Sequence, residues 1–150
     1  MSLSEQIMEA MKTAMKSKDT MALQALRSVK SAILLAQTES GAKETLSEDD
    51  ELKLLQKLVK QRKDSAAIFT EQGRADLADP EIAEAKVIEA FLPEQMSVEE
   101  VAKVIDEIIA QTGAASMKDM GKVMGMANGK LVGKSDSKTI STIVKQRLSQ

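Results

Sequence analysis

Lysines and glycines alternate near the C-terminal end of the chain in a pattern that is typical of phosphate binding. Residues 121–138 read GKVMGMANGKLVGKSDSK, with a glycine at every fourth position from 121 to 133. A backbone without Cβ atoms allows a ligand to approach closely, and lysine ammonium groups contact phosphate oxygens. The candidate contacts to a phosphate backbone are Lys118, Gly121, Lys122, Gly125, Lys130, Lys134 and Lys138.

The end of this stretch, Gly133-Lys134-Ser135, looks like the end of a nucleotide-binding P-loop. A P-loop has another glycine five residues before its second glycine, and it joins a strand to a helix. Position 128 is Asn, the nearest earlier glycine is Gly129, and the preceding segment has a helical pattern. Spacing and context therefore both argue against a nucleotide site.

A helix that begins at Ser116 and Asp119 and ends at Ala127 or Asn128 is expected to position these residues. At about 100° per residue, one side of it is apolar, with Met117, Met120, Val123, Met124 and Ala127. Gly121 and Gly125 lie on the border of that side, next to Lys118 and Lys122. Two compatible roles remain open: another helix packs tightly over the glycines, or a phosphate backbone approaches them.

The two later glycines are expected outside this helix. Each interior glycine costs about 1 kcal/mol relative to alanine, and four of them would cost about 4 kcal/mol. We therefore interpret Gly129 as the C-terminal cap and Gly133 as part of the following turn.

Helical patterns also run through the rest of the chain, and no clear strand pattern accompanies them. The other helices are expected to begin at Ser2 with Glu5, at Asp19 or Thr20, at Ser47, at Asp79 with Pro80, at Ser97 and at Asp136. They are expected to end near Gln37, Gly73, Leu92 and Gly113. Residues 39–47 are expected to form a loop. The sequence thus predicts an all-α protein with a four-helix domain over residues 1–92, a linker at 93–96 and a three-helix domain over 97–150.

The composition excludes several kinds of catalytic and metal site. The chain has no Cys and no His, so thiolate zinc sites, cysteine nucleophiles and imidazole bases are absent. The acidic run SEDDE at 47–51 suits a helix N-terminus better than a metal site, and the Ser65–Lys63 and Ser116–Lys118 pairs are not specific. We predict no catalytic residue, no metal and no cofactor.

Charge and hydropathy bear on partners and location. Net charge is −2, but residues 113–150 carry seven basic against two acidic residues, a net charge of +5. Such a local excess indicates a contact with a polyanion. The amphipathic N-terminus does not look like a signal peptide, and no apolar run approaches the roughly 20 residues of a membrane span. A cytoplasmic location is expected.

Two further segments have open interpretations. The basic run KLVKQRKD at 57–64 predicts a solvated helix face, where Lys53, Lys57 and Lys60 share one side, with an extension of the polyanion-binding surface as the alternative. The first helix is rich in methionine, with Met8, Met11 and Met15. We expect these side chains in the core, with an adaptable protein interface as the alternative.

Four motifs resemble the YqeY proteins: QRKDSAAIF at 61–69, GRADLA at 73–78, FLPEQMS at 91–97 and SMKDMGKVMG at 116–125. That family is related to the tail domain of the B subunit of the tRNA-dependent amidotransferase, the GatB/YqeY domain. The resemblance covers nearly the whole chain in the same order. It departs from the usual pattern at Pro80, which interrupts what is often a continuous charged helix, and after Gly125, where charged residues are few.

The resemblance implies a small helical C-terminal domain that helps to grip tRNA, with Lys118, Gly121, Lys122, Gly125 and the basic turn near Lys134 as candidate contacts. The expected function is a non-catalytic tRNA-binding accessory in translation. The alternative is a protein-interaction module that docks on an amidotransferase or another translation protein. The family label, a carbon–nitrogen ligase with glutamine as amido-N-donor, implies an enzyme, but no ATP site or catalytic triad is recognisable.

Overall fold

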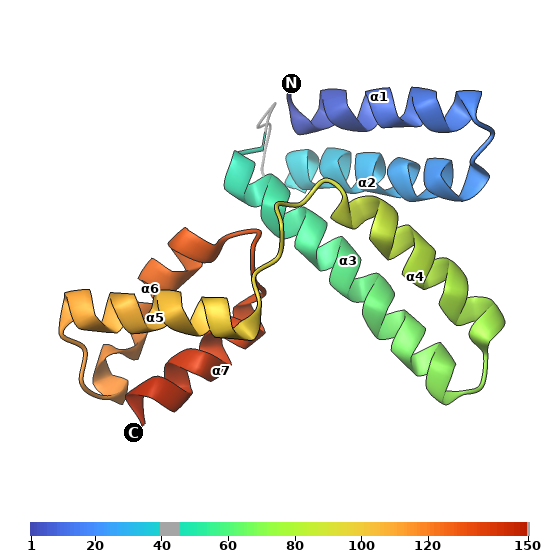
Figure 1. The fold of residues 1–150 in the computed structure, drawn as a ribbon. Helices are drawn as coiled ribbons and strands as arrows, with labels where there is room; N and C mark the ends of the chain where they lie inside the picture. Colours follow the sequence, from blue (N-terminus) through green and yellow to red (C-terminus); the bar gives the residue numbers. More distant parts are fainter. Residues whose placement is uncertain (40–45, 150) are drawn as a thin grey trace. The chain divides into compact units, whose positions relative to one another are not determined.

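The computed structural model describes residues 1–39 and 46–149, and this part of the chain is all-α, as the sequence predicts. The chain divides into two compact units, Met1–Leu92 and Pro93–Gln150 (Figure 1). That they fold as independent domains joined by a linker stays a prediction. Most of the loop expected at 39–47 lies outside the described residues.

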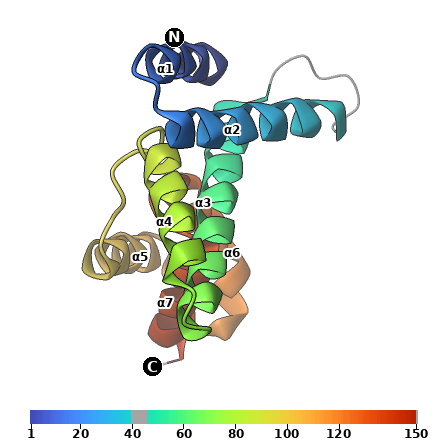
Figure 2. The same cartoon turned by 90° about the vertical axis from the view of Figure 1, so that its right-hand side faces the viewer.

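The N-terminal unit consists of two helical hairpins. Its helices are α1 (Leu3–Lys16), α2 (Thr20–Glu39), α3 (Glu48–Glu71) and α4 (Ala75–Glu89). α1 packs antiparallel to α2, and α3 packs along the length of α4. Figure 2 shows α2 lying across the end of the second hairpin, where α3 begins and α4 ends. The shared core includes Ile7, Leu26, Val29, Ile33, Leu55, Val59 and Ile88.

Capping side chains begin α1 and α3 at the expected residues, and a glycine follows the end of α3. At α1 the Ser2 hydroxyl accepts the Glu5 N–H at 3.2 Å, and the Glu5 carboxylate accepts the Ser2 N–H at 2.9 Å, which completes a capping box. The Ser47 hydroxyl caps α3 by accepting the Asp50 N–H at 3.1 Å. α3 ends before Gly73, whose φ of 70° is the left-handed conformation that glycine adopts readily.

The expected start of the fourth helix at Asp79 and Pro80 is wrong, because α4 is continuous from Ala75 and contains Pro80. Proline has no N–H to donate to the carbonyl of the residue four positions earlier, so the helix loses one hydrogen bond there. Burial explains why the helix continues. Ala78 and Ala85 lie on either side of the proline, and both are buried on the same helix. Packing of this face outweighs the local preference for a break.

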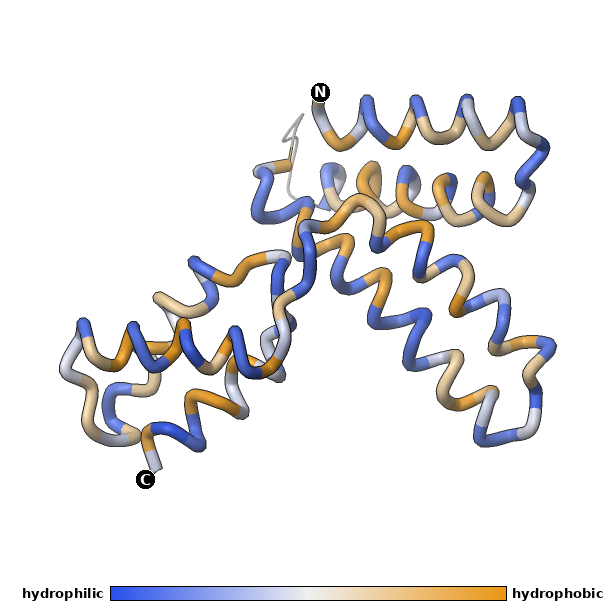
Figure 3. The backbone as a smooth tube through the Cα atoms, viewed as in Figure 1, coloured by the Kyte–Doolittle hydropathy of each residue, from blue (hydrophilic) through white to orange (hydrophobic). Residues whose placement is uncertain are grey.

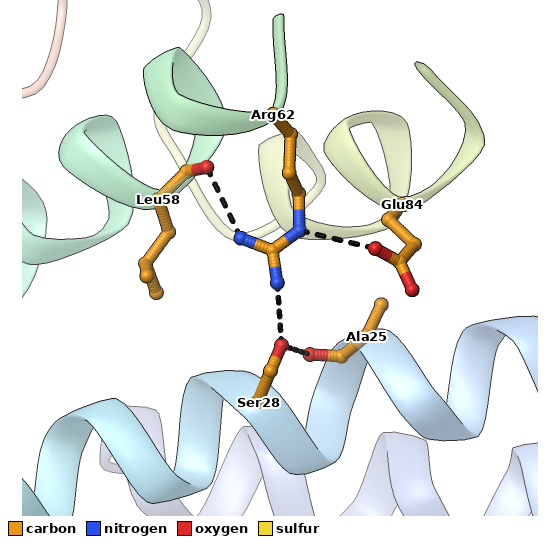
Figure 4. Close-up of polar contacts among 5 residues, drawn as sticks. All are labelled: Ala25, Ser28, Leu58, Arg62 and Glu84. Atoms are coloured by element: carbon orange, nitrogen blue, oxygen red, sulfur yellow. Dashed lines mark hydrogen bonds and ion pairs between the residues drawn. The ribbon is translucent and has the colours of Figure 1, made fainter. Parts of the chain in front are cut away.

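Arg62 ties three helices of the N-terminal unit together (Figure 4). From α3, its guanidinium donates to the Ser28 hydroxyl on α2 at 2.6 Å and to the Leu58 carbonyl at 3.2 Å. Its Nε lies 3.4 Å from the Glu84 carboxylate on α4, and both side chains are more than four-fifths buried. Lys53, Lys57 and Lys60 are exposed, as a solvated face requires, but Arg62 of the KLVKQRKD run is not part of that face.

The C-terminal unit is a three-helix arrangement with one short 3₁₀ turn. Its elements are α5 (Val98–Thr112), η1 (Met117–Asp119), α6 (Met120–Leu131) and α7 (Ser137–Leu148). On the apolar side predicted for the helix after Ser116, Val123 and Ala127 are buried and Met120 and Met124 are partly buried, but Met117 is 46% exposed. Figure 3 shows hydrophobic and hydrophilic stretches alternating along α5. The core contains Val101, Ile105, Ile108, Val123, Ala127, Leu131, Ile140, Ile143, Val144 and Leu148.

The segment expected as a linker is hydrogen-bonded to the C-terminal unit. The Met96 N–H donates to the Lys134 carbonyl at 2.9 Å. The Gln95 side-chain amide donates to the Gly133 carbonyl at 2.6 Å. Residues 95 and 96 are therefore fixed against the turn between α6 and α7.

Two expectations about burial and helix length are wrong. Met8 and Met15 are 45% and 59% exposed, because α1 packs mainly on α2 and buries Ile7 and Ala14. Met11 is partly buried against the core, as expected. α6 continues past Asn128 to Leu131, so Gly129 lies inside the helix and is not its cap. The burial of Leu131 in the core offsets the cost of one more helical glycine.

Candidate nucleic-acid interface

The candidate lysines come from three consecutive elements of the C-terminal unit. Lys118 lies in η1, and Lys122 and Lys130 lie in the first and last turns of α6. Lys134 occupies the turn after α6, and Lys138 lies in the first turn of α7. All five side chains are exposed. The structure therefore presents them to solvent, while the other sides of α6 and α7 form the core.

Three glycines make an exposed strip along α6, which we call the glycine strip: Gly121, Gly125 and Gly129. No described atom outside the local backbone lies within 4 Å of a Cβ built at any of them. Tight packing by another described helix of this chain is therefore not the role of the strip. The four-residue spacing places the glycines in one row about 12 Å long, at a rise of 1.5 Å per residue.

Lys118 and Lys122 form a second row beside the glycine strip. They are also four residues apart, and they precede Gly121 and Gly125 by three residues each, which makes each lysine a surface neighbour of one glycine. A rod-like anion such as a phosphate backbone could thus contact bare helix backbone and ammonium groups together. The arrangement supplies charge and close access but no reactive group.

The lysine charges are not neutralised within the described part of the chain. None of the five lysines forms an ion pair with a described carboxylate. The two acids in the same segment accept backbone N–H groups, and Asp136 thereby caps α7. Asp119 accepts the Ala115 N–H at 3.0 Å, and Asp136 accepts the Thr139 N–H at 2.8 Å. The segment therefore keeps a local positive potential.

The turn that carries Lys134 is well defined. Gly133 is buried and has φ of 76°, a conformation that favours glycine over other residues. The Lys134 N–H donates to the Leu131 carbonyl at 2.9 Å, and the Lys134 carbonyl accepts the Met96 N–H. The backbone at Lys134 is thereby fixed while its side chain stays exposed.

One basic residue of the C-terminal segment has a structural partner that the sequence did not indicate. Arg147 on α7 forms an ion pair with Asp106 on α5, with Nε 2.9 Å from the carboxylate. Residues on different helices and 41 positions apart give no local signal of pairing. The charge available for a polyanion therefore comes mainly from the lysines.

The acidic run at 47–51 borders a cavity of about 330 Å³ in the N-terminal unit, lined by Glu48, Glu51 and Phe91 among others. Burial, and then the neighbouring Glu48 carboxylate, raise the pKa of Glu51. No group of three or more potential metal-binding side chains occurs among residues 1–39 and 46–149. Within these ranges the run forms the acidic first turn of α3 and presents no metal cluster.

Comparison of the sequence with known proteins identifies the family of this chain. The sequence model described as "Yqey-like protein" matches residues 4–148. Over 106 residues the chain is 32% identical to the E subunit of glutamyl-tRNA(Gln) amidotransferase from Thermococcus gammatolerans, an alignment that covers 68% of this chain and 17% of that protein. Over 133 residues it is 37% identical to altered inheritance of mitochondria protein 41, mitochondrial, of Meyerozyma guilliermondii.

That second alignment covers 82% of this chain and 65% of the fungal protein. The namesake protein of Clavispora lusitaniae is 38% identical over 82 residues, which covers 55% of this chain and 46% of that protein. The chain thus spans less than two thirds of the length of each of these relatives. Two of them are named as mitochondrial, so the cytoplasmic location stays a prediction. No described helix has both the length and the apolar character for a membrane crossing.

Proposed function

We propose that this chain, which belongs to the YqeY-like protein family, is a non-catalytic accessory protein that binds tRNA through its C-terminal unit. The observation that carries the proposal is the row of exposed, unpaired lysines beside the glycine strip. The relationship to one component of a glutamyl-tRNA(Gln) amidotransferase supports tRNA as the polyanion, because that relative is named for its tRNA substrate.

The residues available favour recognition of phosphates and shape over recognition of bases. Sequence-specific RNA binding commonly stacks bases on aromatic side chains. The two phenylalanines of the chain, Phe69 and Phe91, both lie in the N-terminal unit, and the C-terminal unit has no aromatic residue. Binding by lysines alone is electrostatic and depends weakly on nucleotide sequence.

A titration of labelled tRNA with a charge-reversed variant tests the proposal. Each phosphate contact contributes about a tenfold gain in affinity at 0.1 M salt, from the salt dependence of such contacts. Lys118→Glu/Lys122→Glu removes two contacts and should weaken binding by about 100-fold. Both side chains are exposed, so the variant should keep the helical circular dichroism of the parent chain.

Lys12→Glu/Lys16→Glu is the matched control. These exposed lysines of α1 have the same four-residue spacing and undergo the same charge change, but they lie in the N-terminal unit. The control should retain binding within a few-fold of the parent chain. Equal losses in both variants, or no tRNA binding by the parent chain, would contradict the proposal. Release of ammonia from glutamine by the purified chain would favour the enzyme label instead.

A further inference from the structure

The N-terminal unit has an apolar groove between α1 and α2 that nothing in the tRNA proposal uses. We call it the methionine groove, and its main lining residues are Ile7, Met8, Lys30, Ile33, Leu34 and Gln37. Its floor is buried, with Ile7 and Ile33 at 1% and 4% exposure. Its walls are open, since Met8 is 45% and Leu34 is 55% exposed. The groove is thus a part of the surface whose apolar walls have no cover among the described residues.

We propose that the methionine groove is a docking site for an acidic amphipathic helix of a partner protein. The groove encloses only about 90 Å³, which is less than small-molecule pockets usually enclose but enough for one or two apolar side chains. Met15 continues the α1 wall two turns beyond Met8 and is 59% exposed. A wall that contains Met8 suits this kind of partner because the flexible methionine side chain adapts to the anchors of a docked helix.

The charge along the α2 wall indicates an acidic partner. Arg27 and Lys30 precede Leu34 by seven and four residues, so all three lie on the same side of α2. Arg27 and Lys30 are exposed, and neither forms an ion pair with a described residue. On α1, Glu5 is engaged in the capping box with Ser2. Acidic side chains of a docked helix would therefore find two unpaired cations at the rim.

The same arrangement disfavours two other occupants. A second copy of this chain, related by a two-fold axis, would bring Arg27 and Lys30 of each copy toward the cations of the other, and like charges oppose such an interface. An RNA phosphate backbone would use the two cations but gain little from the exposed Met8 and Leu34. The acidic helix satisfies both the apolar walls and the basic rim.

Two synthetic helical peptides test this inference with the full-length chain. Both are stapled, fluorescently labelled 16-residue peptides with leucine at positions i, i+3, i+4 and i+7, one with glutamate and one with lysine on the remaining face. The parent chain should bind the glutamate peptide and not the lysine peptide in anisotropy titrations. Met8→Glu/Leu34→Glu should weaken binding of the glutamate peptide by at least about tenfold, the effect expected for truncating central anchors.

Charge reversal on the rim gives the sharper result. Arg27→Glu/Lys30→Glu should exchange the preference, so that the lysine peptide binds and the glutamate peptide does not. Lys53→Glu/Lys57→Glu on α3 is the matched control, since these exposed lysines undergo the same charge change outside the groove and should leave both affinities unchanged.

Three outcomes would overturn the inference. They are absence of binding to the glutamate peptide, equal affinity for a scrambled peptide of the same composition, and binding that neither groove variant changes. Loss of tRNA binding in Arg27→Glu/Lys30→Glu, with no peptide binding by the parent chain, would assign the rim to RNA instead. The tRNA proposal depends on the C-terminal lysines, so either proposal can fail without the other.

Discussion

Replacing Gly125 by alanine should stabilise the C-terminal unit. Gly125 lies inside α6 with an ordinary helical backbone, and a Cβ built there meets no described atom within 4 Å. Alanine therefore gains the full difference in helix propensity, about 1 kcal/mol, without a steric penalty. A rise of about 1 kcal/mol in the free energy of unfolding corresponds to an about fivefold smaller population of the opened unit.

Gly113 is the matched control, because a Cβ built there also meets no described atom within 4 Å. Its φ of 69°, however, is left-handed, so alanine at this position is strained. Gly113→Ala should lower the free energy of unfolding by about 1–2 kcal/mol. The two substitutions add the same methyl group to equally open sites. Opposite changes in the free energy of unfolding would therefore identify the backbone conformation as the cause.

Native-state hydrogen exchange of the buried Ile105 and Val144 amides measures both effects, since these amides report the opening of the C-terminal unit. Exchange should slow in Gly125→Ala and accelerate in Gly113→Ala. Destabilisation by Gly125→Ala would refute the reasoning, because it would mean that the strip is not open. If the strip contacts RNA, Gly121→Ala/Gly125→Ala should also weaken tRNA binding while it stabilises the unit.

Three further substitutions test the fold. Arg62→Met should lower the free energy of unfolding by about 1.5–3 kcal/mol in urea titrations, and adding Glu84→Gln should restore part of the loss because the unpaired carboxylate is removed. Asp136→Ala should cost about 1 kcal/mol and speed hydrogen exchange across α7, since the cap of that helix is lost. Arg74→Gln should raise the pKa of Asp76 in an NMR titration, because the hydrogen bonds from Arg74 hold that pKa below its usual value. The contribution of this pair to stability is present above the ordinary Asp pKa of about 3.9 and is lost as pH falls below it.

Local signals predicted most helix boundaries correctly. Ser2, Ser97 and Asp136 each accept a backbone N–H three residues later, and Gly113 ends α5 in the left-handed conformation. These features depend on residues within one turn of each other, so the sequence contains all that is needed to infer them. The amphipathic spacing of α7 is equally local, and the residues on its apolar side, Ile140, Ile143, Val144 and Leu148, are all buried.

The wrong expectations depend on contacts between distant residues. α4 continues through Pro80 because its alanines are buried, and α6 continues through Gly129 because Leu131 joins the core. The side-chain partners of Arg62 lie on two other helices, 34 and 22 residues away, and nothing in a basic run indicates them. Periodicity also identifies which side of a helix is apolar without showing how far a neighbour covers it, which is why Met8 was expected in the core.

The candidate interface was predictable as a set of residues but not as a surface. The sequence placed the lysines and glycines next to one another on a helix. It left open whether another helix covers the glycines. The open space around Gly121 and Gly125 removes that alternative for the described chain.

The salt dependence of tRNA binding tests the central claim most directly. If the five lysines each contact a phosphate, the logarithm of the affinity should fall with the logarithm of the salt concentration with a slope of about −4 to −5. Affinity should then drop by about 10²–10³-fold between 50 and 200 mM salt. In Lys118→Glu/Lys122→Glu the slope should become shallower by about 2, and in Lys12→Glu/Lys16→Glu it should not change. A slope near zero, or the same slope in the parent chain and the Lys118→Glu/Lys122→Glu variant, would contradict the account.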